Sequence, residues 1–193
     1  MQGNRHWVGS WAAAPAPAEG VVGFNNHTIR LNPRISLGGE RLRVRISNAY
    51  GNRPLAIGAA RIALRDKGPG IVPDSDRKLT FGGSDGTVIA AGAVQFSDPA
   101  DLTVPALADL AVSFHLPDEV LANFSITGRY ARQSNYISPP GGQTQQRHRL
   151  GGDRGLAFLQ QRQILGMELR QKIPHGLCRW QLVPEQQRAS ALS

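Results

Sequence analysis

The sequence predicts an all-β fold, an antiparallel β-sandwich with a jelly-roll-like strand order, followed by a poorly ordered basic tail. In the first 140 residues, apolar and polar side chains alternate with the period of two that half-buried strands show. Turns rich in glycine and proline separate these segments at the short spacing expected of a sandwich. Short strands joined by tight turns cannot make the crossovers of a parallel sheet, so we expect antiparallel pairing.

Two segments alternate most clearly. Residues 41–47 read RLRVRIS, with aliphatic residues on one face and Arg41, Arg43 and Arg45 on the other. Residues 110–116 read LAVSFHL and stop at Pro117, which cannot donate a hydrogen bond to a sheet ladder. Both segments are therefore predicted to be strands with one face in the core.

The remaining candidate strands are shorter or interrupted. A candidate over 29–37 contains Pro33, whose missing N–H predicts an edge position or a bulge at that point. No amphipathic helix is expected before residue 140. The other candidates are 6–11, 55–64 with an irregularity near Ala60, 78–81, 94–96 and 124–137.

The composition of the chain changes near residue 140. The chain has 193 residues, which suits one domain of ordinary size. Its net charge of +8 is uneven, because residues 141–193 hold eight Lys/Arg against three acidic residues, a net +5. Ten glutamines follow position 140 and only three precede it. We therefore predict a β-sandwich domain over 1–142 and a different C-terminal extension over 143–193.

The C-terminal extension has few apolar residues for its length. Residues 156–169 favour at most one short helix, and glycines and prolines interrupt the segment. Its apolar side chains are too few to offset about 1–2 kcal/mol of backbone entropy per ordered residue. We expect 143–193 to be loosely ordered, and the abrupt change of composition is what translation in a wrong reading frame would produce.

Other features bear on compartment and cofactors. No run of about 18 apolar residues occurs, so no transmembrane helix is expected. The first residues do not read as a secretory signal, so the chain as written is expected in the cytoplasm, or secreted if an upstream segment is missing. Cys178 is the single cysteine, which excludes an internal disulfide and a multi-thiolate metal site. No metal or other cofactor is expected.

Several segments, taken in order, resemble a known family. They read WVGSWAAAPAP, FNNHTIR, GGERLRVRISNAYGNRPLAIGAARIALR, LTFGGSDGTVIAAGA, SDPADLTVPALADLAVSFHLP and RQSNYISPPG. Together, over about residues 7–141, they are similar to the N-terminal β domain of two-domain SGNH/GDSL-type hydrolases. The resemblance implies a β domain that precedes a flavodoxin-like α/β domain, which cleaves esters with a serine, an aspartate and a histidine.

The catalytic sequence blocks of that family do not occur in this chain. It contains no Gly-Asp-Ser, no Gly-x-Asn-Asp and no Asp-x-x-His. Without a base and its orienting carboxylate, a serine hydroxyl is a poor nucleophile at neutral pH. We therefore expect no catalytic residue, and interpret the chain as the non-catalytic β domain of such an ester hydrolase, truncated before its catalytic domain and inactive alone.

One motif imitates a catalytic one. Residues 82–86, GGSDG, match the Gly-x-Ser-x-Gly pattern of a nucleophile elbow, in which Ser84 would lie on a turn from a strand into a helix. The residues after it, TVIAAG, are β-branched at first and end in glycine, so the helix is not expected. The motif is interpreted as a turn between strands.

The residues expected to face a partner lie on two polar turns. Asn48 and Tyr50 belong to the first turn, and Asn135 and Tyr136 belong to the second. Exposed polar and aromatic groups on loops are where sites usually lie. We expect these four residues to face a ligand or the SGNH/GDSL catalytic domain, which is the partner that the resemblance implies.

Three other interpretations stay open. The arginine face of 41–47 can meet an anionic partner, although such a face is usually solvated. The basic tail supports only weak, non-specific nucleic-acid binding, and no membrane partner is expected. An independent carbohydrate- or polymer-binding module would use aromatic residues as a sugar-stacking platform, although core packing explains aromatics at strand ends as well. The aromatic residues in question are Trp7, Trp11, Tyr50, Tyr130 and Tyr136.

Overall fold

The computed structural model describes residues 5–12, 22–49, 51–118, 120–122, 135–141 and 165–172, and every regular element in these ranges is a strand. This confirms the predicted all-β fold. The strands are β1 Arg5–Ala12, β2 Val22–Phe24, β3 His27–Leu31, β4 Gly39–Ser47, β5 Leu55–Ile57, β6 Ala59–Leu64, β7 Arg77–Leu79, β8 Thr87–Ile89, β9 Val94–Phe96, β10 Ala100–Val104, β11 Leu110–Leu116, β12 Val120–Ala122, β13 Tyr136–Ile137 and β14 Leu165–Lys172.

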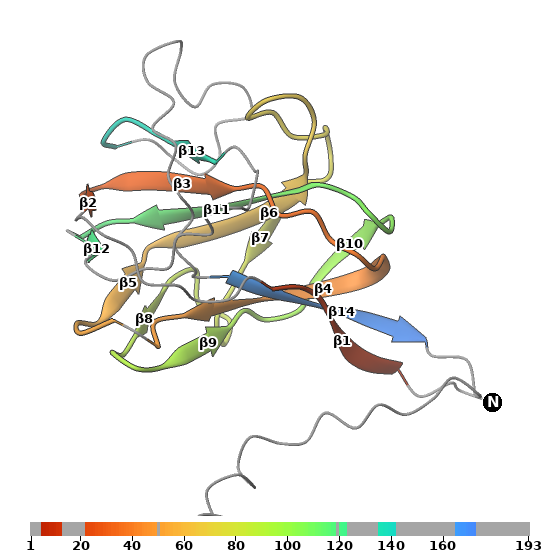
Figure 1. Ribbon diagram of the computed structural model, residues 1–193, viewed down its shortest axis with the longest axis horizontal. Coiled ribbons are helices and arrows are strands. Elements are labelled where there is room, and N and C mark those ends of the chain that lie inside the picture. Colours follow the sequence, from red (N-terminus) through yellow and green to blue (C-terminus); the bar gives the residue numbers. More distant parts are fainter. Residues whose placement is uncertain are drawn as a thin grey trace, which may run out of the picture.

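Two antiparallel sheets pack against each other as a sandwich (Figure 1). The first sheet has the order β1-β14-β4-β10, and β9 also pairs with β4. The second sheet has the order β13-β3-β11-β6-β7. Two small ladders, β2 with β12 and β5 with β8, lie toward the left in Figure 1. The predicted antiparallel sandwich is thus confirmed.

The core lies between the two sheets, and the two clearest predicted strands supply much of it. Strand β4 covers the predicted segment 41–47, and β11 coincides with 110–116. Burying one large aliphatic or aromatic side chain contributes about 1.5–3 kcal/mol, which explains why the alternation there is regular. The inward-facing residues of these two strands are almost fully buried, and they are Leu42, Val44, Ile46, Leu110, Val112, Phe114 and Leu116.

The strand predicted over 29–37 is shorter than expected. Strand β3 ends at Leu31 and is paired on both sides, by β11 and by β13. Pro33 lies beyond the strand, and its carbonyl accepts a hydrogen bond from the Leu110 N–H. The expected edge position or bulge at Pro33 was therefore wrong, because the proline follows the end of the strand.

The candidate over 55–64 is two strands that separate at Gly58. Strand β5 pairs with β8, whereas β6 belongs to the second sheet. Strands β1, β7 and β9 agree with the predictions for 6–11, 78–81 and 94–96 to within a few residues. Of the candidate 124–137, residues 124–134 lie outside the described residues, and the rest contains β13.

Part of the C-terminal extension is a strand of the sandwich. Residues Leu165–Lys172 form β14, which lies between β1 and β4 and is blue in Figure 1. The sequence favoured a short helix over 156–169, and its described part is not helical. Residues 142–164 and 173–193 lie outside the described residues, so the domain boundary at 142 and the loose order of those residues stay predictions.

Candidate interdomain face

A row of polar residues crosses the outer face of the second sheet, and we call it the outer row. Its members are register neighbours on five adjacent strands. The residues before and after them on β3 and β11 face the core, so the outer row lies on the opposite side of the sheet. The outer row consists of Tyr136, Arg30, Ser113, Arg61 and Lys78.

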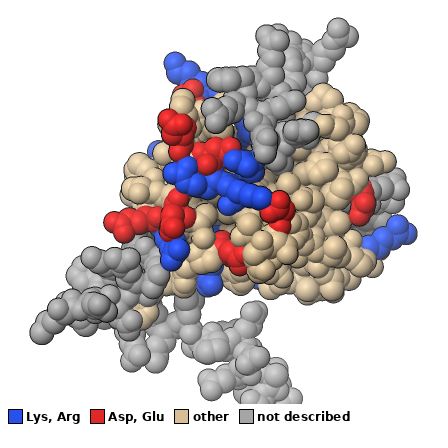
Figure 2. All heavy atoms as spheres, turned by 180° about the vertical axis from the view of Figure 1, so that it is seen from behind, with Lys and Arg blue, Asp and Glu red and all other residues tan. Residues whose placement is uncertain are grey.

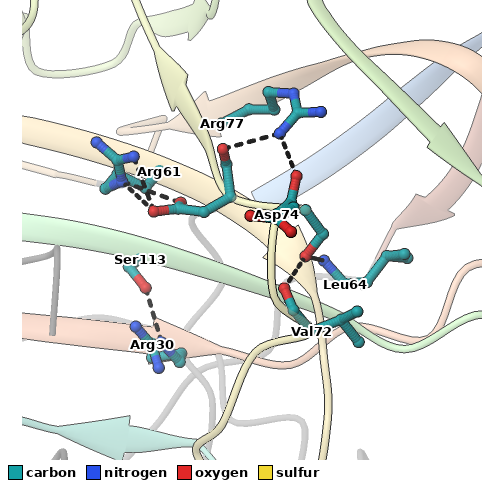
Figure 3. A network of polar contacts seen from close by, with 9 residues as sticks. Arg30, Arg61, Leu64, Val72, Asp74, Arg77 and Ser113 are labelled. Atoms are coloured by element: carbon teal, nitrogen blue, oxygen red, sulfur yellow. Dashed lines mark hydrogen bonds and ion pairs between the residues drawn. The ribbon is translucent and has the colours of Figure 1, made fainter. Parts of the chain in front are cut away.

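The loop between β6 and β7, residues 65–76, lies against the outer row, and we call it the strap. Only 3% of Arg30 and 2% of Ser113 is exposed, although both lie on the outer face. The Arg30 Nε donates a 2.8 Å hydrogen bond to the Ser113 Oγ (Figure 3). The Arg30 Nη1 donates to the carbonyl of Pro69 in the strap. A buried guanidinium thus joins the strap to the middle of the sheet.

The charge environment of Arg30 is unusual for an arginine. Burial lowers the pKa of Arg30 below its ordinary value, and the nearby negative charge of Asp76 acts in the opposite direction. An arginine stays charged in proteins because its ordinary pKa is so high. The sheet therefore carries a buried cation whose hydrogen-bond acceptors are a hydroxyl and a peptide carbonyl.

Ion pairs hold both ends of the strap. At its end, Asp76 accepts from Arg61 through both carboxylate oxygens, with Nε–Oδ1 at 2.9 Å and Nη2–Oδ2 at 2.7 Å. At its start, the Arg65 N–H donates to the Asp109 carbonyl at 2.9 Å, and the Arg65 Nη1 lies 3.8 Å from the Asp109 Oδ2. Bidentate arginine–carboxylate geometry is the stronger of the two arrangements, so the Asp76 end is the firmer one.

The predicted site residue Asn135 is a buried amide at the end of β13. It is 7% exposed, and its Oδ1 accepts a 3.1 Å hydrogen bond from the Asn32 N–H. Its Nδ2 has no hydrogen-bond partner among the described residues. Buried donors are usually paired, since an unpaired one costs about 1–3 kcal/mol. The Asn135 Nδ2 is therefore a buried donor for which the described residues provide no acceptor.

The rest of the segment 135–141 is attached along β3. Ser138 exchanges two hydrogen bonds with Thr28: its Oγ accepts from the Thr28 N–H at 2.9 Å, and its N–H donates to the Thr28 carbonyl at 2.8 Å. Tyr136 is half-buried, and a Cβ at Gly68 in the strap would lie 3.9 Å from its hydroxyl. The segment 135–141 thus forms the β13 edge of the second sheet, the strap lies beside its Tyr136, and we call the surface that the two form the interdomain face.

Asn48 has a structural role that the sequence did not indicate. Its Nδ2 lies within hydrogen-bond distance of the carbonyls of Arg53, Ile89 and Ala90, at 2.9, 3.0 and 3.0 Å. Its own backbone N–H donates to the Ala93 carbonyl at 2.8 Å. Asn48 therefore connects the end of β4 to the turns beside β5 and β8.

The four predicted site residues do not come together as one site. Asn135 and Tyr136 lie on the edge of the second sheet, whereas Asn48 follows β4 of the first sheet. Tyr50 lies outside the described residues. The structure thus brings one of the two predicted pairs together, and a role for Asn48 at an interface stays a prediction.

The GGSDG motif is a tight turn, as the sequence indicated. Phe81 and Ser84 exchange backbone hydrogen bonds across the turn, and Gly82 and Gly83 have φ of 60° and 83°. Strand β8 follows at Thr87, so no helix begins at Ser84. The Asp98 carboxylate accepts from the N–H groups of both glycines at 3.0 and 2.8 Å. The turn is therefore organised around Asp98.

The aromatic residues considered for sugar stacking are spread over different faces. Trp7 lies on the outer face of the first sheet, where its ring centroid is 4.6 Å from the Arg43 Cζ, and Phe96 lies at the same distance from Arg43. Trp11 packs against the core instead, because the register of β1 shifts between Gly9 and Trp11. Tyr50 and Tyr130 lie outside the described residues.

Several charged side chains on the described surface form ion pairs. Figure 2 shows basic and acidic groups interleaved on one face of the molecule. The ion pairs include Lys78–Asp85 at 2.5 Å and Arg41–Asp101 at 2.7 Å. Interleaved charge of this kind is typical of a solvated face rather than of a site for a polyanion.

No protein-family model matches the chain, and no curated protein matches it either. Within the described ranges, no helix is long and apolar enough to cross a membrane. The same ranges contain no group of three His, Cys, Asp or Glu side chains placed to hold a metal ion. Fold and site together define an antiparallel β-sandwich with a strap over a buried arginine.

Three residues that organise the interdomain face were not predicted from the sequence: Arg30, Ser113 and Asp76. The alternation Thr28, Ile29, Arg30, Leu31 is visible in the sequence, but it is typical of a solvated outer face. Its contact with the strap, which lies far from Arg30 in sequence, is part of what buries this arginine. A glycine-rich stretch at Gly68-Pro69-Gly70 was the one available signal, and it indicated a turn without indicating what the turn covers.

Proposed function

We propose that this chain is the non-catalytic β-sandwich domain of an SGNH/GDSL-type ester hydrolase, and that it packs against the catalytic domain of such an enzyme. The observation that carries the proposal is the ordered series of segments similar to the family over about residues 7–141. Strands β2 to β13 all lie within that range, and β1 overlaps its start. The range of the resemblance thus contains every described strand except β14 and the start of β1.

The interdomain face is the surface that we assign to this contact. It holds the Asn135 Nδ2, a buried donor without a partner among the described residues, next to the half-buried Tyr136. The Tyr136 side chain keeps part of its surface open to a neighbouring domain. The strap, held by Arg30 and Asp76, gives this face a defined shape.

Activity and association test different parts of the proposal. Incubation with short-chain p-nitrophenyl esters should give no hydrolysis above buffer. Turnover that disappears in Ser84→Ala would overturn the non-catalytic interpretation, because it would make the GGSDG turn a nucleophile site. Association is measured by titration calorimetry with a separately produced SGNH/GDSL catalytic domain.

Variants localise the contact. Tyr136→Ala should weaken the association at least about tenfold, which corresponds to 1.4 kcal/mol. Arg45→Ala is the matched control, since Arg45 is exposed on the first sheet and away from the interdomain face. Absence of heat with the unaltered chain, or equal loss in both variants, would contradict the assignment.

A carbohydrate- or polymer-binding module is the second candidate function. The observation that favours it is the pair of partly exposed aromatic rings, Trp7 and Phe96, on either side of Arg43. Sugars stack on such rings, and a neighbouring guanidinium can donate to their hydroxyls. Affinity electrophoresis against a polysaccharide panel tests this: retardation that is lost in Trp7→Ala would support it, and uniform migration on every gel would remove it.

A further inference from the structure

We propose that β1 and β4 form a strand-acceptor site that takes up the segment Leu165–Lys172 of a second copy of this chain when its own copy of that segment is displaced. In the described structure the same segment of the chain itself, β14, occupies the site. The inference concerns the first sheet alone and does not depend on the family proposed above.

The two walls of the site are strands that do not pair with each other. Strand β1 pairs with β14 from Arg5↔Lys172 to Ala12↔Gly166. Strand β4 pairs with the other side of β14, from Leu42↔Leu169 to Ile46↔Leu165. The opposite edge of β4 is already paired, by β10 at one end and β9 at the other. Without β14, both walls would therefore present unpaired N–H and C=O groups, which readily bind an extended peptide.

Strand β1 is attached to the sandwich by contacts that do not involve β14. The Ser10 carbonyl accepts from the Ser36 N–H at 3.0 Å, and its Oγ accepts from the Leu37 N–H at 2.9 Å and donates to the Leu37 carbonyl. Trp11 packs against the core, and Trp7 lies against Arg43 of β4. These contacts hold the first wall near β4 even when the strand between them leaves.

The occupant is specified by the register of its residues with β4. Leu165, Met167 and Leu169 stand in register with Ile46, Val44 and Leu42, each of which is 0% exposed. Glu168 lies between them and is the register partner of Arg43. The ligand is therefore an extended peptide with apolar residues at alternate positions and an acidic residue opposite an arginine, a favourable cross-strand pair.

Exchange with a second copy follows from how β14 is connected. Residues 142–164 separate it from the last described residue of the β3 edge. A strand joined covalently to the chain that accepts it competes at an effective concentration on the order of mM. The tethered strand should therefore exclude a free one at ordinary concentrations, and a chain with a defective β14 should accept the strand from outside.

The test uses the full chain carrying Met167→Pro together with a fluorescent peptide of residues 165–172. Proline in the middle of β14 removes a ladder donor and should release the tethered strand. Fluorescence anisotropy should show the peptide binding this variant at least about tenfold more tightly than the unaltered chain. A peptide with the same residues in scrambled order, and one carrying Glu168→Lys, should bind at least about tenfold more weakly.

A second measurement tests the proposal without the Met167→Pro variant, in case that variant does not fold. The full chain with Val8→Cys and Cys178→Ser is refolded from urea with excess peptide carrying Leu169→Cys, whose register partner is Val8. A disulfide should form with this peptide and not with one carrying Glu168→Cys, because paired positions lie within disulfide distance. Equal crosslinking of both peptides, or equal binding of the scrambled peptide by Met167→Pro, would overturn the proposal.

Discussion

The buried guanidinium of Arg30 gives the sharpest stability prediction. Ser113→Ala removes the hydroxyl that accepts from the Arg30 Nε and leaves a charged donor unpaired at a site where 3% of Arg30 is exposed. Hydrogen bonds to charged groups contribute about 1.5–3 kcal/mol. We expect Ser113→Ala to lower the free energy of unfolding by about 2 kcal/mol.

Arg30→Met should destabilise the chain less than Ser113→Ala does, although it removes a larger polar group. The substitution keeps the apolar part of the side chain and removes the cost of burying a charge that pairs with no carboxylate among the described residues. Replacing buried ionic groups by apolar residues of similar volume is often neutral or stabilising. We therefore expect Arg30→Met to change the free energy of unfolding by less than about 1 kcal/mol, and Ser113→Ala to have almost no effect when it is added to Arg30→Met.

The free energy of unfolding is measured by urea unfolding followed by tryptophan fluorescence. The four chains compared are the unaltered chain, Ser113→Ala, Arg30→Met and the double variant, which together form a double-mutant cycle. With a slope of about 2 kcal/mol per M, the loss in Ser113→Ala should lower the midpoint by about 1 M. The coupling energy between the two positions should then be about 2 kcal/mol. A loss of more than about 3 kcal/mol in Arg30→Met alone, or an equal effect of Ser113→Ala in both backgrounds, would refute the reasoning.

Three further predictions concern the turns. Asn48→Asp should destabilise the chain more than Asn48→Ala at neutral pH, as measured by urea midpoints, because a carboxylate would face three carbonyl oxygens where the amide now donates. The pKa of Asp98 is held below its ordinary value by the Gly83 N–H, the Thr80 hydroxyl and the Gly82 N–H. This contribution to stability is present above the unfolded-state pKa and is lost as pH falls through the lower folded-state pKa, so Asp98→Asn should flatten the acid side of a plot of Tm against pH. Gly83→Ala should cost about 1–2 kcal/mol in thermal unfolding because φ is positive there, whereas Ser84→Ala, at an exposed position, should change Tm little.

Sequence alternation predicted strands well where one face is buried over several residues. Strands β4 and β11 have this property, and both were predicted nearly to their ends. Strand β10 also alternates, with Ala100, Leu102 and Val104 buried, but it is short and starts directly after a proline, so the pattern was overlooked. Strand β14 was missed because glutamine, glycine and charged residues surround its three apolar positions.

Two residues of the interdomain face were predicted from the sequence, whereas the residues that hold its strap were not. Asn135 and Tyr136 were selected as polar and aromatic residues near a turn, which is a local property of the sequence. The burial of Arg30 depends on Pro69, and the ion pair of Asp76 depends on Arg61. Such contacts between distant residues leave no periodic signal in a single sequence, so their roles emerge only from the folded chain.

The position of β14 also affects the order in which the sandwich can form. Strand β1 is synthesised early, yet its partner across the ladder is Leu165–Lys172, which leaves the ribosome on the order of ten seconds or more later at ordinary rates of translation. Once β13 has been synthesised, and until Leu165–Lys172 follows, the second sheet has all of its strands whereas the first lacks its middle. Pairings so distant in sequence close slowly and leave a strand edge open to other nascent chains. The yield of folded protein should therefore depend on how fast the last third of the message is translated.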